Sequence, residues 1–590
     1  MKRAHFRHLP VALFIVVLAL APLGLSEFSV TLFDYIGLSA LVALGLVLLT
    51  GVGGLTSFGQ AAFVGLGAYA TAYLSTAHGV SPWLALCAGL LLTLVVALGL
   101  GFITLRLSGH FLPLGTIAWG ISLYFLFGNI EWLGGHTGIS GIPALDFFGI
   151  ELKSPQQFYY LIWIVVMAAM LLTRNLLDSR EGRAIRALKG GTLMAEAMGV
   201  NTPRSKIVIF TIAALFACIS GWLYAHLQRF VNPTPFSLAQ GIEYLFMAVI
   251  GGVANVWGAL LGAGLITLLK QWLQDWLPQL LGQSGNFEVI VFGVLMIVML
   301  HRARDGLWPI IMGWWPQRAV SRATFTGAAL ARRQPPQAGT LLLEVKDATK
   351  RFGGLVANNR MNFSVRSGEV MALIGPNGAG KSTLFNAISG VDPVSSGEVH
   401  FLGEAIQTLG ARDIARRGLS RTFQHVRLLP TMSVLENVAI GAHLRGRKNF
   451  LHAAFRTERA EEASLLHEAA VQIERCGLGG HANDAAGSLP LGKQRLVEIA
   501  RALAADPSLL LLDEPAAGLR YLEKQTLAEL LRRLRTEGMG ILLVEHDMDF
   551  VMGLADRVVV MEFGEKLAEG RPEEVQRNPA VLEAYLGGVA

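Results

Sequence analysis

The chain has 590 residues, of which 53% are hydrophobic and only 16% are charged, and its formal net charge is +6. Soluble proteins have roughly 25% charged residues, so the composition excludes a chain that lies entirely in water. The deficit of charge lies before about Leu300, whereas the sequence after about Leu341 has the composition of a soluble domain. Length and this asymmetry together predict two domains, one in the membrane and one in water.

The basic residues gather at the start of the chain, between Arg174 and Lys206, and at Arg302 and Arg304. These positions flank apolar segments, so we interpret them as the cytoplasmic charges of a membrane protein and not as a nucleic-acid surface. The apolar start is compatible with a signal peptide. An uncleaved first span is favoured because another apolar run follows within a few residues. The three cysteines lie far apart and form no metal or disulfide pattern.

Ten apolar segments are candidate membrane spans, because a helix needs about 20 residues to cross a bilayer. They cover residues 9–26, 31–50, 58–77, 82–106, 111–134, 158–175, 206–229, 241–254, 256–273 and 287–301. Six crossings place the basic Arg174–Lys206 loop on the same side as the N-terminus. The stretch 241–273 is too long for one span, and Gly251-Gly252 indicates a break. Two crossings there return the chain inside near His301, although a re-entrant pair gives the same parity.

Two membrane segments are rich in small residues, Ser57–Ala70 and Gly251–Leu265. Small residues let helices approach each other closely in lipid, where apolar packing alone gives no drive. We interpret both segments as helix contacts, with the lining of a translocation path as the alternative.

A phosphate-binding motif stands between an apolar strand (Val370–Ile374) and a predicted helix. It reads GPNGAGKST and fits the pattern GxxxxGK[ST]. In this pattern the glycines let backbone N–H groups surround phosphates, Lys381 reaches the terminal phosphates, and the Ser382 hydroxyl suits Mg²⁺. The residues predicted to bind ATP here are Gly375, Asn377, Gly378, Ala379, Gly380, Lys381, Ser382 and Thr383.

Two carboxylates follow the apolar run of LLLLDEP, residues 509–515. In P-loop proteins an aspartate at such a strand end holds Mg²⁺, which here is Asp513. Glu514 is then the candidate general base that polarises the attacking water. The alternative, two solvated acids after a strand, does not explain their place downstream of the phosphate-binding motif.

From Leu341 onward these motifs and their order resemble the ATP-binding cassette (ABC) ATPases, which have an α/β P-loop fold with a helical subdomain, here at about residues 425–505. The resemblance implies that Phe352 in KRFGGL stacks on adenine, with a plain core Phe as the alternative. It also implies that Gln424 in RTFQHVRLLP contacts Mg²⁺ and that His546 in ILLVEHDM contacts the terminal phosphate. The implied catalytic residues are Glu514, His546 and Gln424, and the implied Mg²⁺ ligands are Ser382, Gln424 and Asp513.

An altered signature turn stands where ABC proteins usually carry LSGGQ. It consists of Leu489, Pro490, Leu491, Gly492 and Lys493. In the head-to-tail dimers of this family, one subunit's signature closes over the other subunit's ATP. Pro490 removes a backbone donor and the serine hydroxyl, and Lys493 adds a charge. Arg520 stands where a dimer-contacting aspartate is usual. The chain's own P-loop is intact, so we expect a weaker partner site and therefore a heterodimer.

The loop 178–206 contains Glu196-Ala-Met-Gly199, which is similar to the coupling loop of ABC importers, whose short helix docks near the ATPase glutamine; an ordinary basic loop is the alternative. With SFGQAAFVGLGAYA, the membrane half resembles the permease of branched-chain amino acid importers. The other half resembles their ATPase subunit. The resemblance implies a permease of about ten spans (1–310), a linker (311–340) and an ABC ATPase (341–590) fused in one chain.

The implied function is ATP-driven import of branched-chain or other hydrophobic amino acids, with ATP and Mg²⁺ as cofactors. The implied partners are a second permease, a second ABC ATPase and a substrate-binding protein, and no nucleic acid. The implied location is the inner membrane of a bacterium, with the ATPase in the cytoplasm. Related permeases carry urea, amides and aromatic acids, so these cargoes stay open. An ABC exporter half-transporter is the other alternative, which would show fewer spans and long cytoplasmic helices.

Overall fold

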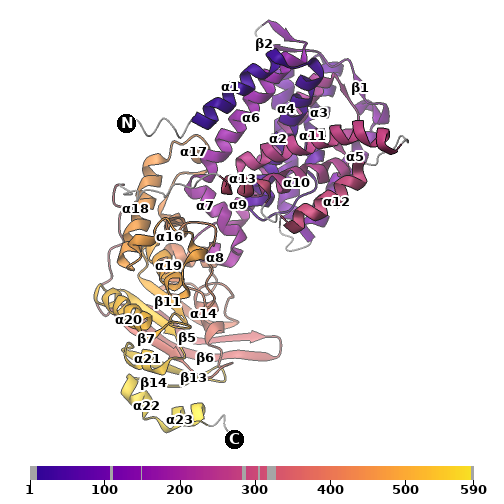
Figure 1. The fold of residues 1–590 in the computed structure, drawn as a ribbon. Coiled ribbons are helices and arrows are strands. Elements are labelled where there is room, and N and C mark those ends of the chain that lie inside the picture. Colours follow the sequence, from indigo (N-terminus) through magenta and orange to yellow (C-terminus); the bar gives the residue numbers. More distant parts are fainter. Residues whose placement is uncertain are drawn as a thin grey trace. The chain divides into compact units, whose positions relative to one another are not determined.

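The computed structural model describes residues 9–105, 111–147, 149–281, 288–302, 306–314 and 327–586 (Figure 1). The chain forms two compact units. The first unit comprises Met1–Leu176 and Pro203–Arg318, and the second unit comprises Leu177–Thr202 and Ala319–Ala590. The loop between two apolar helices therefore belongs by its contacts to the second unit, together with the C-terminal half of the chain.

The first unit is helical. Its helices are α1 (Leu9–Gly24), α2 (Glu27–Leu46) with a π-helical turn η2 (Val47–Val52), α3 (Gln60–Ala77), α4 (Pro82–Thr104), α5 (Phe111–Asn129), α6 (Pro155–Leu177), α9 (Thr202–Gln228), α10 (Leu238–Gly252), α11 (Val256–Leu281), α12 (Glu288–Arg302) and α13 (Leu307–Gly313). In the described part of the chain, six helices are long and apolar enough to cross a membrane: α2 with η2, α4, α5, α6, α9 and α11. Each of the ten predicted segments overlaps a helix, and the number of crossings stays a prediction.

Two glycines of the small-residue segments, Gly67 and Gly262, lie at close helix contacts, as predicted for these segments. A Cβ atom at Gly67 of α3 would lie 2.2 Å from the carbonyl oxygen of Cys218 in α9. A Cβ at Gly262 of α11 would lie 1.8 Å from the carbonyl oxygen of Met247 in α10. Any larger side chain at these positions would push the helices apart, so glycine sets their separation.

Short antiparallel pairs connect the helices of the first unit. Strand β1 (Ile139–Ser140) pairs with β4 (Phe230–Val231), and β2 (Leu145–Phe147) pairs with β3 (Ile150–Leu152). The first pair ties the segment after α5 to the segment after α9.

The second unit contains two sheets. The six-stranded sheet has the order β10 (Leu419–Arg421), β11 (Leu509–Asp513), β12 (Gly540–Val544), β7 (Val370–Ile374), β13 (Arg557–Glu562) and β14 (Glu565–Gly570), and all neighbours are parallel except β13 and β14. The four-stranded sheet has the order β6 (Leu355–Arg366), β5 (Leu341–Phe352), β8 (Ser396–Phe401) and β9 (Glu404–Ala405) and is antiparallel. Every residue of β7, β11 and β12 is buried. Continuous apolar runs form such strands because both faces of a parallel sheet are covered.

Twelve helices of the second unit lie in its described part. They are α7 (Arg180–Lys189), α8 (Thr192–Ala197), α14 (Lys381–Ile388), α15 (Ala411–Arg417), α16 (Val434–Gly441), α17 (Phe450–Ala454), α18 (Arg459–Arg475), α19 (Leu491–Ala504), α20 (Tyr521–Thr536), α21 (Met548–Met552), α22 (Pro572–Gln576) and α23 (Pro579–Leu586). Helices α16, α18 and α19 pack on one another and form a helical layer beside the sheet. A capping box between Ser433 and Glu436 begins α16.

The described part of the predicted linker lies along the second unit. The Arg333 N–H donates to Asp506 Oδ2 at 2.6 Å, and its guanidinium donates to the Arg416 carbonyl at 2.6 Å. Arg445 donates to the Ala331 carbonyl at 2.9 Å. These bonds fix the chain just before β5.

A buried charge cluster on α19 holds the segment after β10. Arg501 Nη2 lies 3.1 Å from Glu498 Oε1, and Arg495 Nη1 lies 3.7 Å from Glu498 Oε2. Glu498 Oε1 also accepts the Arg427 N–H at 2.8 Å, while Arg501 donates to the Arg427 carbonyl at 2.8 Å. Glu498 is 2% exposed. One carboxylate therefore compensates two buried guanidinium groups and anchors a loop.

The substitution Glu498→Ala leaves both arginines buried without their carboxylate. We expect the second unit to lose about 3–5 kcal/mol of unfolding free energy, as when one partner of a buried ion pair is removed. Denaturant unfolding of the full chain in detergent measures this loss. The matched control is Glu529→Ala on the exposed face of α20, which should change stability by less than about 0.5 kcal/mol. Equal effects of the two substitutions would contradict the role of the cluster.

Candidate active site

A glycine-rich loop joins β7 to α14. Gly375, Gly378 and Gly380 have φ angles of 153°, 83° and 91°, which residues with side chains rarely adopt. A Cβ atom at Gly380 would lie 2.3 Å from the Ala357 carbonyl oxygen. The loop therefore curls tightly before α14, whose N-terminal N–H groups and dipole favour an anion.

Lys381 is buried at the start of α14, inside this loop. Its ammonium donates to the carbonyl oxygens of Gly375 at 2.8 Å and Pro376 at 2.9 Å. Burial lowers the pKa of Lys381, and the charges of Glu514 and Asp513 oppose this shift. The ammonium is therefore held by weak neutral acceptors, which phosphate oxygens can replace. Of the other residues predicted to bind ATP, Asn377 and Ala379 lie in the loop, and Ser382 and Thr383 lie in the first turn of α14.

Three polar side chains meet at the ends of neighbouring parallel strands. Gln424 Nε2 donates to Glu514 Oε1 at 2.9 Å, and His546 Nε2 lies 3.2 Å from the same oxygen. They follow β10, β11 and β12, which are adjacent in the sheet. Glu514 has a positive φ of 49°, and its N–H donates to the Val544 carbonyl at 2.9 Å. The structure thus brings together the three predicted catalytic residues around one carboxylate that can accept a proton from water.

Arg421 is a site residue that the sequence analysis missed. Its Nη2 lies 3.3 Å from Asp513 Oδ2, and its Nη1 donates to Asn386 Oδ1 at 2.7 Å and Ser389 Oγ at 2.8 Å. Arg421 and Asp513 are both buried. Burial raises the pKa of Asp513, and Arg421 opposes this shift. Arg421 therefore fixes Asp513 relative to α14, at the base of the phosphate loop.

Asp513 has a carboxylate oxygen whose lone pairs are free to bind Mg²⁺. Its Oδ1 is buried and has no hydrogen-bond partner among the described residues. Oxygen atoms are the donors that Mg²⁺ prefers, and it usually takes one or two carboxylates plus phosphate oxygens and water. The residues present therefore fit Mg²⁺, with Asp513, Ser382 and Gln424 as its predicted protein ligands.

Glu545 is a second residue that the sequence analysis missed. It is buried at the end of β12, and its carboxylate accepts the N–H groups of Ala516 and His546, the latter at 3.1 Å. Burial raises the pKa of Glu545, while these N–H groups oppose the shift. Glu545 therefore positions the segment after Glu514. An acid directly after a buried strand was the only signal for it in the sequence.

Phe352, the predicted adenine-stacking residue, ends β5 with its ring half exposed. The Lys350 ammonium lies 5.0 Å from the ring centroid and bonds Asp392 Oδ1 at 2.6 Å. The ring is therefore an exposed aromatic surface and not part of a core.

The altered signature turn begins α19. Pro490 is the N-cap residue and makes no side-chain cap, so the first turn of the helix keeps its N–H groups open. Leu489 is buried and Leu491 is half exposed. A Cβ atom at Gly492 would lie 2.4 Å from Glu523 Oε1, so a larger residue there would displace the Glu523 carboxylate.

The Lys493 side chain is held within its own subunit. Its Nζ lies 2.7 Å from His481 Nε2, and His481 Nδ1 lies 2.7 Å from Asp484 Oδ2. This chain of contacts requires a neutral His481 that donates from Nδ1 and accepts at Nε2. The Lys493 ammonium is therefore held by His481 and does not add its charge to the open N–H groups of α19.

The loop between α6 and α9 packs on the ATP-binding half of the second unit through an apolar cluster. Its members are Ala184, Ala187, Met194, Ala195, Ala197, Met198, Val200, Phe423, Leu429, Met432 and Ile440. Two of these, Phe423 and Leu429, stand on either side of Gln424 in the sequence. Helices α7 and α8 therefore contact the same short segment that carries Gln424, the predicted catalytic glutamine. We call residues 177–202 the docking segment.

Charged groups surround this apolar cluster. Arg183 donates to both carboxylate oxygens of Glu462, to Oε2 at 3.0 Å, and Arg186 Nη1 lies 2.8 Å from Glu436 Oε1. The Arg412 side chain donates to the Gly199 carbonyl at 3.2 Å. These ion pairs fix the register of α7 on α16 and α18.

The two predicted coupling residues shape the end of α8. Glu196 accepts a hydrogen bond from the Thr202 hydroxyl, which closes the turn before α9. Gly199 has a φ of 86°, and a Cβ atom there would lie 2.1 Å from Leu444 Cγ. Gly199 is therefore a position at which the chain contacts the ATPase half too closely for any side chain.

Comparisons with known proteins agree along the chain. The family model of branched-chain amino acid transport system permease components matches residues 29–300, that of ABC transporters matches residues 358–517, and that of branched-chain amino acid ATP-binding cassette transporters matches residues 565–590. The high-affinity branched-chain amino acid transport ATP-binding protein BraF of Pseudomonas aeruginosa is 44% identical over 249 residues, which are 42% of this chain and 98% of BraF. The chain belongs to the branched-chain amino acid ABC transporter family.

Two further similarities fall on the same half of the chain. The ATP-binding protein LivG of Escherichia coli K12 is 43% identical over 249 residues, which are 42% of this chain and 98% of LivG. A nucleotide-free ATP-binding cassette from an ABC transporter, known from its crystal structure, is 33% identical and covers 42% of this chain and 99% of its own, with a TM-score of 0.38. This member of the family carries a permease and an ATPase in one chain, and it couples ATP hydrolysis to transport across a membrane.

The substitution Gly199→Ala should weaken the docking segment. The added Cβ meets Leu444, and alanine at this φ is strained by roughly 1–2 kcal/mol. We expect transport per ATP hydrolysed to fall about fivefold or more, a coupling loss of at least about 1 kcal/mol, while basal ATP hydrolysis persists. Uptake and phosphate release in proteoliposomes of the assembled transporter measure this ratio.

The matched control is Gly480→Ala, because a Cβ atom at Gly480 meets nothing within 4 Å and no left-handed φ is required. It should leave the ratio unchanged. A normal ratio in Gly199→Ala would show that close contact at α8 is not needed for coupling.

Proposed function

We propose that this chain supplies one permease and one ATPase of an importer for branched-chain or other hydrophobic amino acids, in the inner membrane of a bacterium with the ATPase in the cytoplasm. A substrate-binding protein would deliver the cargo, and a second permease and a second ABC ATPase would complete the assembly. The similarity to BraF and LivG, named for branched-chain amino acid transport, supports the cargo. The observation that carries the proposal is the docking segment, which joins a permease helix to the segment bearing the catalytic glutamine.

In the proposed reaction, the phosphate loop binds the nucleotide and Lys381 moves from the Gly375 and Pro376 carbonyls to the terminal phosphate oxygens. Glu514 accepts a proton from the attacking water, and Gln424 and His546 orient this carboxylate through the contacts described above. Mg²⁺, held by Asp513, Ser382 and Gln424, would neutralise charge on the phosphate oxygens. Phe352 would stack on adenine.

The two ATP sites of the assembled dimer would be unequal. This chain would supply an intact phosphate loop and base to one site, and the altered turn of Pro490 and Lys493 to the other. The lysine is held by His481, so it does not replace the missing serine hydroxyl as a phosphate ligand. This asymmetry supports pairing with a different ATPase chain that has a regular signature.

The substitution Glu514→Gln should abolish steady-state ATP hydrolysis, by about 100-fold or more, because the general base is lost. The corresponding change in the partner ATPase should reduce hydrolysis much less. Phosphate release by the complex reconstituted with its permease and ATPase partners, with and without loaded binding protein, measures both.

Equal effects of the two substitutions would contradict the asymmetry. Stimulation of ATP hydrolysis by a binding protein loaded with leucine, isoleucine or valine supports the proposed cargo. Stimulation only with urea, an amide or an aromatic acid would make that compound the cargo instead. Turnover by this chain alone, indifferent to any binding protein, would overturn the importer and favour an exporter.

A further inference from the structure

The first unit contains an irregular segment between η2 and α3, residues 53–59. The Phe58 N–H donates to Thr116 Oγ1 at 3.1 Å, and a Cβ atom at Gly59 would lie 2.9 Å from the Thr116 carbonyl oxygen. The segment is thus pressed against α5. Within a membrane, non-helical backbone is tolerated only where protein covers it or where it lines a cavity.

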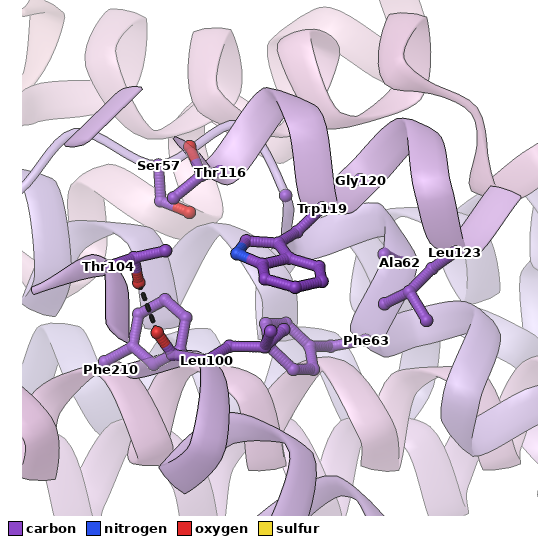
Figure 2. A pocket seen from close by; sticks show the side chains of 11 residues that line it. Ser57, Ala62, Phe63, Leu100, Thr104, Thr116, Trp119, Gly120, Leu123 and Phe210 are labelled. Atoms are coloured by element: carbon purple, nitrogen blue, oxygen red, sulfur yellow. Dashed lines mark hydrogen bonds between the residues drawn. The ribbon is translucent and has the colours of Figure 1, made fainter. Parts of the chain in front are cut away.

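This segment lines a narrow pocket bounded by α3, α4, α5 and α9 (Figure 2). Phe63, Trp119 and Phe210 form aromatic walls, and no charged side chain lines the pocket among the described residues. The free space is on the order of one water molecule. Trp119 lines the pocket and is 36% exposed, so its indole borders both the pocket and the outer surface of the first unit.

The pocket contains a polar group without a partner. Ser57 is 2% exposed, and its hydroxyl has no hydrogen-bond partner among the described residues. In Figure 2 this hydroxyl lies on the pocket side of the segment, near Thr116 and opposite Trp119. A buried hydroxyl that is left unpaired costs roughly 1–3 kcal/mol, so a ligand that pairs with it gains this amount.

The N-terminus of α3 faces the same pocket. Gly59 is the N-cap of this 18-residue helix and makes no side-chain cap, and Gly59, Ala62 and Phe63 all line the pocket. At the start of α3 the Ala62 N–H donates to the Gly59 carbonyl at 3.2 Å, which leaves the N–H groups of Gln60 and Ala61 open, and the helix dipole adds positive potential there. The Ser57 hydroxyl and these N–H groups together suit a carboxylate.

We propose that this pocket is a substrate subsite inside the permease, which binds the carboxylate of a hydrophobic amino acid at the start of α3. Ser57 and the first N–H groups of α3 hold the carboxylate, and Phe63 and Phe210 contact the apolar side chain. The ammonium group stays at the mouth, where the Trp119 ring offers a cation–π contact. The present narrow form is the closed one, and the indole moves aside on entry. This subsite rests on the proposed function, because it takes the same cargo.

Cysteine protection tests the subsite without ATP turnover. The variant Ser57→Cys, in a chain that also carries Cys87→Ala to remove an exposed thiol, is assembled with its partner subunits and labelled with N-ethylmaleimide. Leucine and 4-methylpentanoate, which both carry the carboxylate, should slow labelling about tenfold at about ten times their Kd. The amine 3-methylbutylamine, which lacks the carboxylate, should leave the labelling rate unchanged.

The control Ser140→Cys places a thiol on the exposed strand β1, outside the pocket and outside the apolar helices. Its labelling should not respond to any of the three compounds. No protection of Ser57→Cys by leucine and the acid, or equal protection by the amine, overturns the carboxylate subsite.

A second variant, Ser57→Ala, removes the hydroxyl without adding volume. The KM for leucine uptake should rise about three- to tenfold, the loss of one hydrogen bond, while stimulation of ATP hydrolysis by the loaded binding protein stays normal. An unchanged KM overturns the role of Ser57. The two proposals fail separately: leucine import by the wild type without protection of Ser57→Cys overturns the subsite alone, whereas absence of leucine import by the wild type overturns the proposed function.

Discussion

The hydrogen bonds and ion pairs between α19 and the segment after β10 are the constraint on which the catalytic arrangement depends. Arg495 donates to the carbonyl oxygens of Phe423 and Gln424, and Glu498 and Arg501 hold both backbone groups of Arg427. A loop would otherwise be free to move at this place. The helix that presents the predicted signature turn therefore also fixes Gln424, the predicted catalytic glutamine.

The same segment packs on the docking segment, within the second unit. Phe423 and Leu429 belong to the apolar cluster of the docking segment, and Gln424 between them contacts Glu514. A displacement of this segment therefore changes three sets of contacts at once: those with α19, the hydrogen bond from Gln424 to Glu514, and the packing of α8. Coupling between hydrolysis and transport needs such a shared element, because a ligand shifts an equilibrium only through contacts that differ between two states. Buried ion pairs suit this role, since they fix geometry more than they add stability.

Much of this arrangement could be predicted from the sequence because strands and loops of P-loop proteins follow from local patterns. GPNGAGKST after an apolar strand predicts the phosphate loop, and the strand-end position of Asp513 and Glu514 puts them at the same edge. Arg421, Arg495 and Glu545 could not be found this way. Each is a charged residue whose burial depends on contacts with residues far away in the sequence. Such burial produces no periodic pattern or fixed residue spacing from which it could be predicted.

In the membrane half, too, local features could be predicted from the sequence and long-range contacts could not. Apolar runs predict its helices, and glycines at Gly67 and Gly262 predict their close approach, because both signals are local. The small-residue segment at Ser57 is visible in the sequence, but the pocket beside it is not, because α4, α5 and α9 supply the other walls. The docking segment was predicted from Glu196 and Gly199, whereas its ion pairs with Glu436 and Glu462 join residues more than 200 positions apart.

A charge exchange between Arg183 and Glu462 tests whether this chain's docking segment acts on its own ATPase. The measurement is amino acid taken up per ATP hydrolysed by the reconstituted transporter carrying Arg183→Glu, Glu462→Arg, or both. We expect each single substitution to lower this ratio severalfold and the double substitution to restore most of it. Normal ratios in both single variants, or a double variant no better than the worse single one, would contradict the account.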